Sequence, residues 1–273
     1  MQDWGHLLSL AGLMLATGVV GGVLAGLLGV GGGIVIVPVL EFALSILGVD
    51  PAIRMHVAVA TSLATIIPTS ISSSRAHHRR GAVDLALVRR WGPAIFLGTA
   101  AGAVIAAFVK SAVLSGVFGV VALTVALRLI FLTKEPKLAP AIPTHPVVLL
   151  VPFVIGGVSA LMGIGGGTLS VLVMTMWGYA IHRAVGTSSL FGLLIAVPAT
   201  IGYVISGWGD PRLPAASLGY VNLLGLAFIA PMTWLAAPLG AKIAHGMSKR
   251  QLSMFFGVFL LIVGGRMLIK TFG

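Results

Sequence analysis

Charge is the scarcest feature of this 273-residue sequence. Charged residues make up 8% of it, against about 25% in soluble domains, and its six acidic residues and seventeen Lys and Arg cannot cover a domain of this size. Hydrophobic residues make up 58%. This balance excludes a soluble fold and indicates an all-α polytopic membrane protein, for which the lipid bilayer is a partner.

Cysteine is absent, so the chain can form neither a disulfide nor a thiolate metal site. The motifs HExxH and GxSxG are also missing, as is a glycine loop followed by Lys-Ser or Lys-Thr. We therefore expect no enzyme activity, no cofactor and no metal site. The formal charge of +11 comes from cations in short gaps between apolar runs, so we expect no nucleic-acid partner.

Apolar runs of about 20 residues, the length that crosses a bilayer, recur along the chain. They span residues 55–74, 91–110, 112–133, 184–206, 219–241 and 251–271. A glycine-broken pair of runs precedes each group of three, at 7–29 with 34–48 and at 147–162 with 168–180. Together they predict about 8–10 membrane segments. The first run lacks the cationic start of a signal peptide, so we expect it to be a retained helix.

The chain also matches itself at unusual residues. The aligned positions are Gly29, Gly31, Gly32 and Gly33 with Gly163, Gly165, Gly166 and Gly167; His56, Thr61 and Ser62 with His182, Thr187 and Ser188; and Asp84 and Arg128 with Asn222 and Arg266. Their order is preserved, which is typical of an internal repeat. We predict a first membrane repeat at residues 1–132, a Pro-rich cytoplasmic linker at 133–146 and a second membrane repeat at 147–273.

Loop charge indicates how the repeats are oriented. If each glycine-broken pair returns the chain to the side from which it came, the repeats are inverted, and of the seventeen cations twelve gather on one side and five on the other. Otherwise the split is eleven to six, and the first crossing takes about 40 residues, twice what a bilayer needs. We therefore expect inverted repeats, with the loop RAHHRRG in the cytoplasm and both termini outside it.

The two glycine motifs form the first candidate site. A helix break inside lipid is tolerated only where it lines a cavity, and a helix that restarts near Ile34 or Thr168 offers free N–H groups to an anion. Close helix packing through small residues is the alternative, and we expect it at Gly22 with Gly26 and at Gly98 with Gly102. The candidate substrate-binding residues at the breaks are Gly31, Gly32, Gly33, Ile34, Gly165, Gly166, Gly167 and Thr168.

Hydroxyl groups form the second candidate site. The stretches HVAVATS (56–62) and HRAVGTSS (182–189) begin two long apolar helices, and their hydroxyls can project into the cavity opened by the glycine breaks. We therefore add Thr61, Ser62, Thr187 and Ser188 to the candidate substrate-binding residues. The alternative is that these side chains bond to carbonyls of their own helix or to a neighbouring helix.

Four more residues are candidates for gating or a proton relay: His56, His182, Arg75 and Glu41. The histidines lie at helix starts, where an interfacial cap also explains them. Arg75 belongs to a cationic loop that the positive-inside bias also explains. Glu41, one of the few acids near the apolar zone, can carry a proton or a cation.

Together these motifs resemble the TauE/SafE sulfite exporter family, also called the sulfonate uptake permease family. The resemblance rests on two halves that each open with G-hydrophobic-GGG, on the ATS and GTSS stretches, and on RRGAVDL after a His-containing loop. It implies a multi-pass secondary transporter of the bacterial inner membrane. The substrate would be a small sulfur-containing anion, sulfite or an organosulfonate such as sulfoacetate, moved by alternating access between the two repeats.

Two alternatives stay open at this point. One is an anion channel, and the other is a membrane transporter of another small organic anion. The sequence does not determine the exact substrate, the direction of transport, the coupling ion, or whether the chain forms a homodimer.

Overall fold

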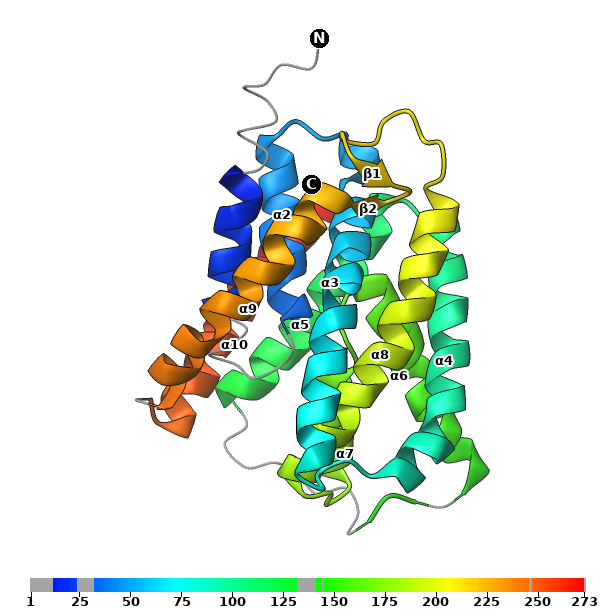
Figure 1. Ribbon diagram of the computed structural model, residues 1–273, viewed down its shortest axis with the longest axis vertical. Helices are drawn as coiled ribbons and strands as arrows, with labels where there is room; N and C mark the ends of the chain where they lie inside the picture. Colours follow the sequence, from blue (N-terminus) through cyan, green and yellow to red (C-terminus); the bar gives the residue numbers. More distant parts are fainter. Residues whose placement is uncertain (1–11, 24–31, 132–140, 144, 246, 273) are drawn as a thin grey trace.

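The structure, a computed structural model, describes residues 12–23, 32–131, 141–143, 145–245 and 247–272 (Figure 1). A helix spans Gly12–Val23. The elements that follow are α2 (Gly33–Ile46), α3 (Pro51–Arg79), α4 (Leu85–Phe108), α5 (Ser111–Phe131), the 3-10 helix η1 (Pro146–Leu149), α6 (Leu150–Met162), α7 (Gly167–Met176), α8 (Ile181–Ser206), β1 (Ser217–Leu218), β2 (Val221–Asn222), α9 (Leu223–His245) and α10 (Lys249–Phe272).

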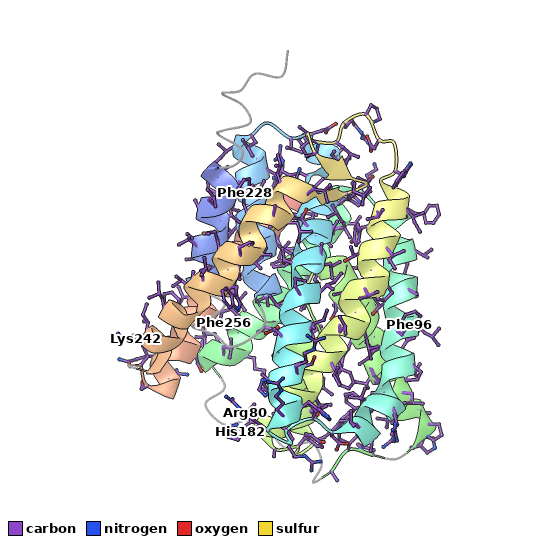
Figure 2. The ribbon with its side chains drawn as sticks, in the orientation of Figure 1. Arg80, Phe96, His182, Phe228, Lys242 and Phe256 are labelled. Carbon is purple, nitrogen blue, oxygen red and sulfur yellow. The ribbon has the colours of Figure 1, made fainter. Side chains whose placement is uncertain are left out.

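Within the described residues, five helices are long and apolar enough to cross a membrane, and five shorter helices are also apolar. The long ones are α3, α4, α5, α8 and the part of α10 at Ser253–Thr271. Large apolar side chains such as Phe96 point away from the bundle (Figure 2), as lipid-facing side chains do. The chain is thus an all-α polytopic membrane protein, as the composition predicts.

Helix α3 is the central element of the bundle. It packs against α8, α2, α5 and α9, and Figure 1 shows it between α2 and α8. Asp50 starts it, because the carboxylate accepts a hydrogen bond from the Ala52 N–H and Pro51 occupies the first helical position. α3 runs from the end of the bundle with the β1–β2 hairpin, the hairpin end, to the end with Arg80, the Arg80 end (Figure 2).

The short hairpin is an element that the apolar run at 219–241 did not predict. β1 and β2 pair antiparallel with Ser217 opposite Asn222, and α9 begins only at Leu223. The helix starts there because the Asn222 side chain accepts a hydrogen bond from the Gly225 N–H (2.7 Å), which caps the first turn.

Glycine lets helices from opposite halves of the chain approach closely. A Cβ at Gly98 of α4 would overlap the carbonyl oxygen of Phe153 in α6, and one at Gly102 would lie 2.5 Å from the Gly157 carbonyl oxygen. A Cβ at Gly22 would lie 2.7 Å from the Thr233 Cα in α9. The packing expected at Gly22, Gly98 and Gly102 is confirmed, and Gly26 lies outside the described residues.

This packing generates a stability prediction. Gly98→Ala should lower the melting temperature of the detergent-purified protein, because the new methyl group meets backbone and overpacking costs about 1–3 kcal/mol. Gly116→Ala is the matched control, since its Cβ would lie 3.5 Å from the flexible Thr271 side chain. Equal melting temperatures for the two variants, measured by tryptophan fluorescence, would contradict the α4–α6 contact.

Candidate functional site

The two glycine breaks meet inside the bundle. Gly32 precedes α2 with a φ of 78° and Gly163 ends α6 with a φ of 70°, and both values lie in the left-handed region that favours glycine. A Cβ at Gly33 would lie 2.8 Å from the Gly163 carbonyl oxygen and 2.9 Å from the Ile164 Cα. Backbone therefore touches backbone where the breaks meet. Gly29 and Gly31 lie outside the described residues.

The second break is also packed against α3 and α8. A Cβ at Gly165 would lie 2.9 Å from the Ile66 Cγ2, and one at Gly166 would lie 2.6 Å from the Ile195 Cδ1. Close packing thus explains in part why glycine occupies positions 165 and 166. α2 and α7 begin at Gly33 and Gly167, within one residue of the predicted restarts near Ile34 and Thr168.

Ser62 connects α3 to the second break. Its hydroxyl donates a hydrogen bond to the Gly163 carbonyl oxygen (2.8 Å), and both atoms are buried. A carbonyl at a helix break has no backbone N–H partner within the helix, and lipid offers no donor, so it needs a side-chain donor such as this one. A serine of the first half thus satisfies the backbone of the break in the second half.

Thr61 and Thr187 hold equivalent positions in two helix-start contacts. The Thr61 hydroxyl accepts the backbone N–H of Asn222 (3.0 Å), and the Thr187 hydroxyl accepts that of Asp84 (3.0 Å). Asp84 in turn caps α4 by accepting the Leu87 N–H (3.0 Å). Each threonine therefore anchors a helix start in the other half, at positions that the self-comparison aligns. These two hydroxyls therefore bind a neighbouring helix start, which is the alternative to a substrate-binding role.

The remaining candidates lie in different surroundings. Ile34 is buried in the core. Ser188 donates to the Val185 carbonyl of its own helix (2.9 Å), which is the other alternative for these hydroxyls. Arg75 is exposed near the Arg80 end of α3.

The beginning of α7 offers donors that lack partners. The first N–H groups of a helix have no partner within it, and here the helix starts at Gly167 inside the bundle. Two side chains of its first turns, Thr168 Oγ1 and Ser170 Oγ, are buried with no hydrogen-bond partner among the described residues. Ser170 is fully buried and faces Gly166, whose Cβ would lie 3.3 Å from the Ser170 Oγ. These groups form the α7 donor site.

The two aligned histidines differ. His56 is buried, with Nε2 3.1 Å from the Ala106 carbonyl oxygen and Nδ1 3.4 Å from the Ser111 Oγ. A carbonyl only accepts, so Nε2 carries the proton, and a neutral imidazole satisfies both contacts. His182 is exposed at the start of α8, at the Arg80 end (Figure 2). The two therefore make different contacts despite their equivalent sequence positions.

Glu41 lies buried in α2 among three cations. Arg54 and Arg266 lie 3.9 Å and 4.0 Å from its carboxylate oxygens, and Lys270 donates to it. Arg128, the residue aligned with Arg266, instead places Nη1 3.1 Å from the Met176 Sδ. The two halves therefore place equivalent arginines in different electrostatic surroundings.

Asp84 also links separate segments at the Arg80 end of the bundle. Its Oδ2 accepts hydrogen bonds from the Tyr179 hydroxyl and from Arg183 Nη2 (3.2 Å). Partial burial raises the pKa of Asp84, but the Tyr179, Leu87 and Arg183 donors outweigh it, so the pKa lies below its ordinary value. Burial and the Asp84 carboxylate raise the pKa of Tyr179 to about 12. The contact is complete at neutral pH and weakens only in acid, as Asp84 is protonated.

No sequence motif indicated Ser170 or Tyr179 as a functional residue. Asn222 and Asp84 align in the internal repeat, but their capping roles were not predicted. Ser170 could have been found, because it lies two residues past Thr168 in the stretch GGGTLS. The alignment of Asn222 with Asp84 was a usable signal for a shared capping role. Tyr179 had no such signal, because its contact with Asp84 joins loops 95 residues apart.

Comparisons with known proteins match nearly the whole chain. The family described as "Sulfite exporter TauE/SafE" matches residues 14–267. A Haemophilus influenzae protein named "Probable membrane transporter protein" is 31% identical over 258 residues, covering 94% of this chain and 98% of its own. "Probable membrane transporter protein YunE" of Bacillus subtilis is 28% identical over 281 residues, covering 94% and 97%. No solved structure matches.

The family match covers nearly the whole chain, including both glycine breaks, the threonine contacts and the α7 donor site. The similar proteins extend over the same span and carry membrane transporter names. This chain belongs to the TauE/SafE sulfite exporter family of membrane transporters.

Proposed function

We propose that this protein is a secondary transporter of small sulfur-containing anions, sulfite or organosulfonates such as sulfoacetate, in the bacterial inner membrane. The observation that carries the proposal is the α7 donor site. Within the described part of the chain, Thr168 Oγ1 and Ser170 Oγ are buried without partners at the start of a helix, whose first N–H groups have no partner within the helix. Buried polar groups of a native protein have partners as a rule, and a bound anion would supply them.

The chemistry of the α7 donor site favours an oxyanion. Backbone N–H groups and hydroxyls donate hydrogen bonds, and the start of a helix carries a partial positive charge. Sulfite and sulfonate groups present three acceptor oxygens to such donors. A site built from neutral donors also releases its anion more readily than one built from arginine, because its attraction is weaker. A carrier needs that release in each cycle.

The threonine contacts support alternating access between two inverted repeats. Thr187 with Asp84 lies at the Arg80 end, and Thr61 with Asn222 lies at the hairpin end (Figure 1). Opening of one end would separate its contact while the other stayed closed. The two ends differ in charge, because Asp84 also binds Tyr179 and Arg183. By the loop-charge bias, we place the Arg80 end in the cytoplasm.

The α7 donor site makes a binding prediction. Sulfite or sulfoacetate should raise the melting temperature of the purified protein in a concentration-dependent way. The double variant Thr168→Val with Ser170→Ala should bind the same anion more weakly, by roughly 100-fold or more, because two hydrogen bonds to a charged group are lost. Thermal-shift titration measures both effects.

The control for this titration is Thr200→Val. Thr200 Oγ1 is also buried with no partner among the residues that the structure describes, but it lies on α8 beyond Ile195, whose side chain lies against the break. We expect this variant to bind the anion as the unaltered protein does. Unchanged affinity in the double variant would refute the α7 donor site, and single-channel currents in place of saturable counterflow in liposomes would refute the carrier.

The Asp84 contact makes a second prediction. Asp84→Asn keeps an acceptor for the Leu87 N–H, as Asn222 does in α9, but loses the charge that binds Arg183. The Arg80 end should then open more often. Ser189 is half-buried on α8, two residues past Thr187, which contacts Asp84. A single cysteine at Ser189, in a chain with no other cysteine, should be alkylated roughly two- to fivefold faster, the range for a partly exposed ion pair.

Asp210→Asn is the control for the alkylation measurement, because Asp210 pairs with Arg212 at the hairpin end (2.6 Å). It removes the same charge, and we expect no change in the alkylation rate at Ser189. Equal rates in the Asp84 variant and the unaltered protein would show that the Asp84 contact does not hold this end closed.

A further inference from the structure

A cluster of charge at the hairpin end is not used by the proposed transport mechanism. Glu41, 3% exposed, is the one carboxylate near three cations in the described part of the chain: Arg54 Nη1 at 3.9 Å, Arg266 Nη2 at 4.0 Å, and the donor Lys270. The cluster has a formal charge of +2. In apolar surroundings an excess of this size is costly unless a counter-anion neutralises it.

The three cations differ in what else they bind. Arg54 is buried, and its guanidinium donates to the Val49 carbonyl oxygen (3.0 and 2.6 Å) and to the Ser45 Oγ (3.0 Å). The Arg266 side chain is 47% exposed and lies over the Phe42 ring at 4.6 Å. The Lys270 side chain is 38% exposed. Arg266 and Lys270 are therefore the two cations that an external anion can reach.

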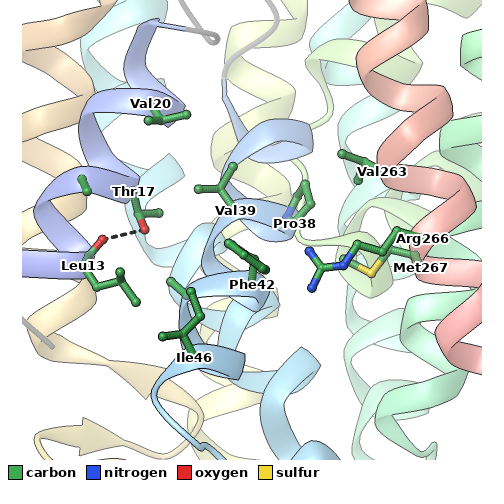
Figure 3. A pocket seen from close by; sticks show the side chains of 12 residues that line it. Leu13, Thr17, Val20, Pro38, Val39, Phe42, Ile46, Val263, Arg266 and Met267 are labelled. Atoms are coloured by element: carbon green, nitrogen blue, oxygen red, sulfur yellow. Dashed lines mark hydrogen bonds between the residues drawn. The ribbon is translucent and has the colours of Figure 1, made fainter. Parts of the chain in front are cut away.

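An apolar groove is lined in part by Arg266, and Lys270 lies one turn farther along α10. It has a volume of about 400 Å³ and lies between the Gly12–Val23 helix, α2 and α10 (Figure 3). Its walls are Leu13, Val20, Val39, Phe42, Ile46 and Val263, with Arg266 among them. The Thr17 hydroxyl in this wall bonds to the Leu13 carbonyl oxygen (2.8 Å), so its hydrogen is not offered to the groove. The groove thus combines a cationic edge with an apolar wall.

The cluster lies near helix ends, because Glu41 is five residues before the end of α2 and Arg54 is three residues after the start of α3. Lys270 is two residues from the end of α10 and Arg266 is six, so Arg266 lies about 9 Å along the helix from that end. α2 ends nearby, at Ile46. Long cationic side chains at this depth reach towards the membrane surface.

We propose that this groove binds an anionic phospholipid, whose phosphate pairs with Arg266 and Lys270 and whose acyl chain lies along the apolar wall. Basic pockets between membrane helices bind anionic headgroups by this combination of contacts. A free inorganic anion would neutralise the two cations but leave the apolar wall without a partner. The proposal does not depend on the substrate of transport, because the α7 donor site and the groove share no residue.

The test is lipid binding by the full-length protein in detergent. Bound lipid is counted by native mass spectrometry during titration with phosphatidylglycerol or phosphatidylcholine. We expect the unaltered protein to prefer phosphatidylglycerol. Arg266→Gln with Lys270→Gln should weaken its binding roughly 30-fold, because each basic residue near the headgroup contributes to the attraction.

Two further variants separate charge from shape. Lys110→Gln with Arg212→Gln removes two cations at the same end of the bundle but outside the groove, and phosphatidylglycerol binding should stay unchanged. Ala16→Phe fills the groove from an exposed position and leaves the cluster intact. It should weaken phosphatidylglycerol binding even if the charge variant fails to fold.

Three results would overturn the proposal. The first is equal binding of the two lipids by the unaltered protein. The second is unchanged phosphatidylglycerol binding in both Ala16→Phe and the Arg266 and Lys270 variant. The third is displacement of phosphatidylglycerol by inorganic phosphate, with no effect of Ala16→Phe, which would assign the cluster to a free anion.

Discussion

The hydrogen bond from Ser62 to the Gly163 carbonyl oxygen is the interaction on which the central arrangement depends. A helix that breaks inside a membrane leaves backbone groups unpaired, and each costs several kcal/mol if it stays so. Ser62 pairs one of them from α3, and Gly33 allows the backbone of the other break to come into contact. Among the described residues, Thr168 Oγ1 and Ser170 Oγ at the start of α7 are left without partners, and we propose that the anion supplies them.

The two halves of the chain are joined by contacts in which a residue of one half binds a residue of the other. α4 packs on α6 through Gly98, and α9 packs on the Gly12–Val23 helix through Gly22. Thr61 and Thr187 likewise each bind a backbone N–H of the opposite half. Because each half completes the other, a movement of one half changes contacts at both ends of the bundle. This coupling is the physical basis on which we propose alternating access.

The charged residues break the equivalence of the halves. Asp84 at one helix start stands where Asn222 stands at the other, and Arg266 lies near Glu41 while Arg128 lies against Met176. The contacts of Thr61 and Thr187 repeat in the two halves, whereas the aligned Ser62 and Ser188 bind different carbonyls. The ion pairs differ, and we propose that they serve different roles at the two ends of the bundle: closure by Asp84 at one, and lipid binding at the other.

The sequence by itself determined the all-α membrane fold, because hydrophobic length and scarce charge allow little else, and it placed the helix restarts within one residue. It also singled out Thr61, Ser62 and Thr187, since repeated polar residues in apolar helices are conspicuous. Only the tertiary structure decided that these hydroxyls bind backbone of the other half, that Tyr179 reaches Asp84, and that Lys270 reaches Glu41. The reason is physical: these contacts join segments 95 to 229 residues apart, and helix packing alone sets which side chains meet across that separation.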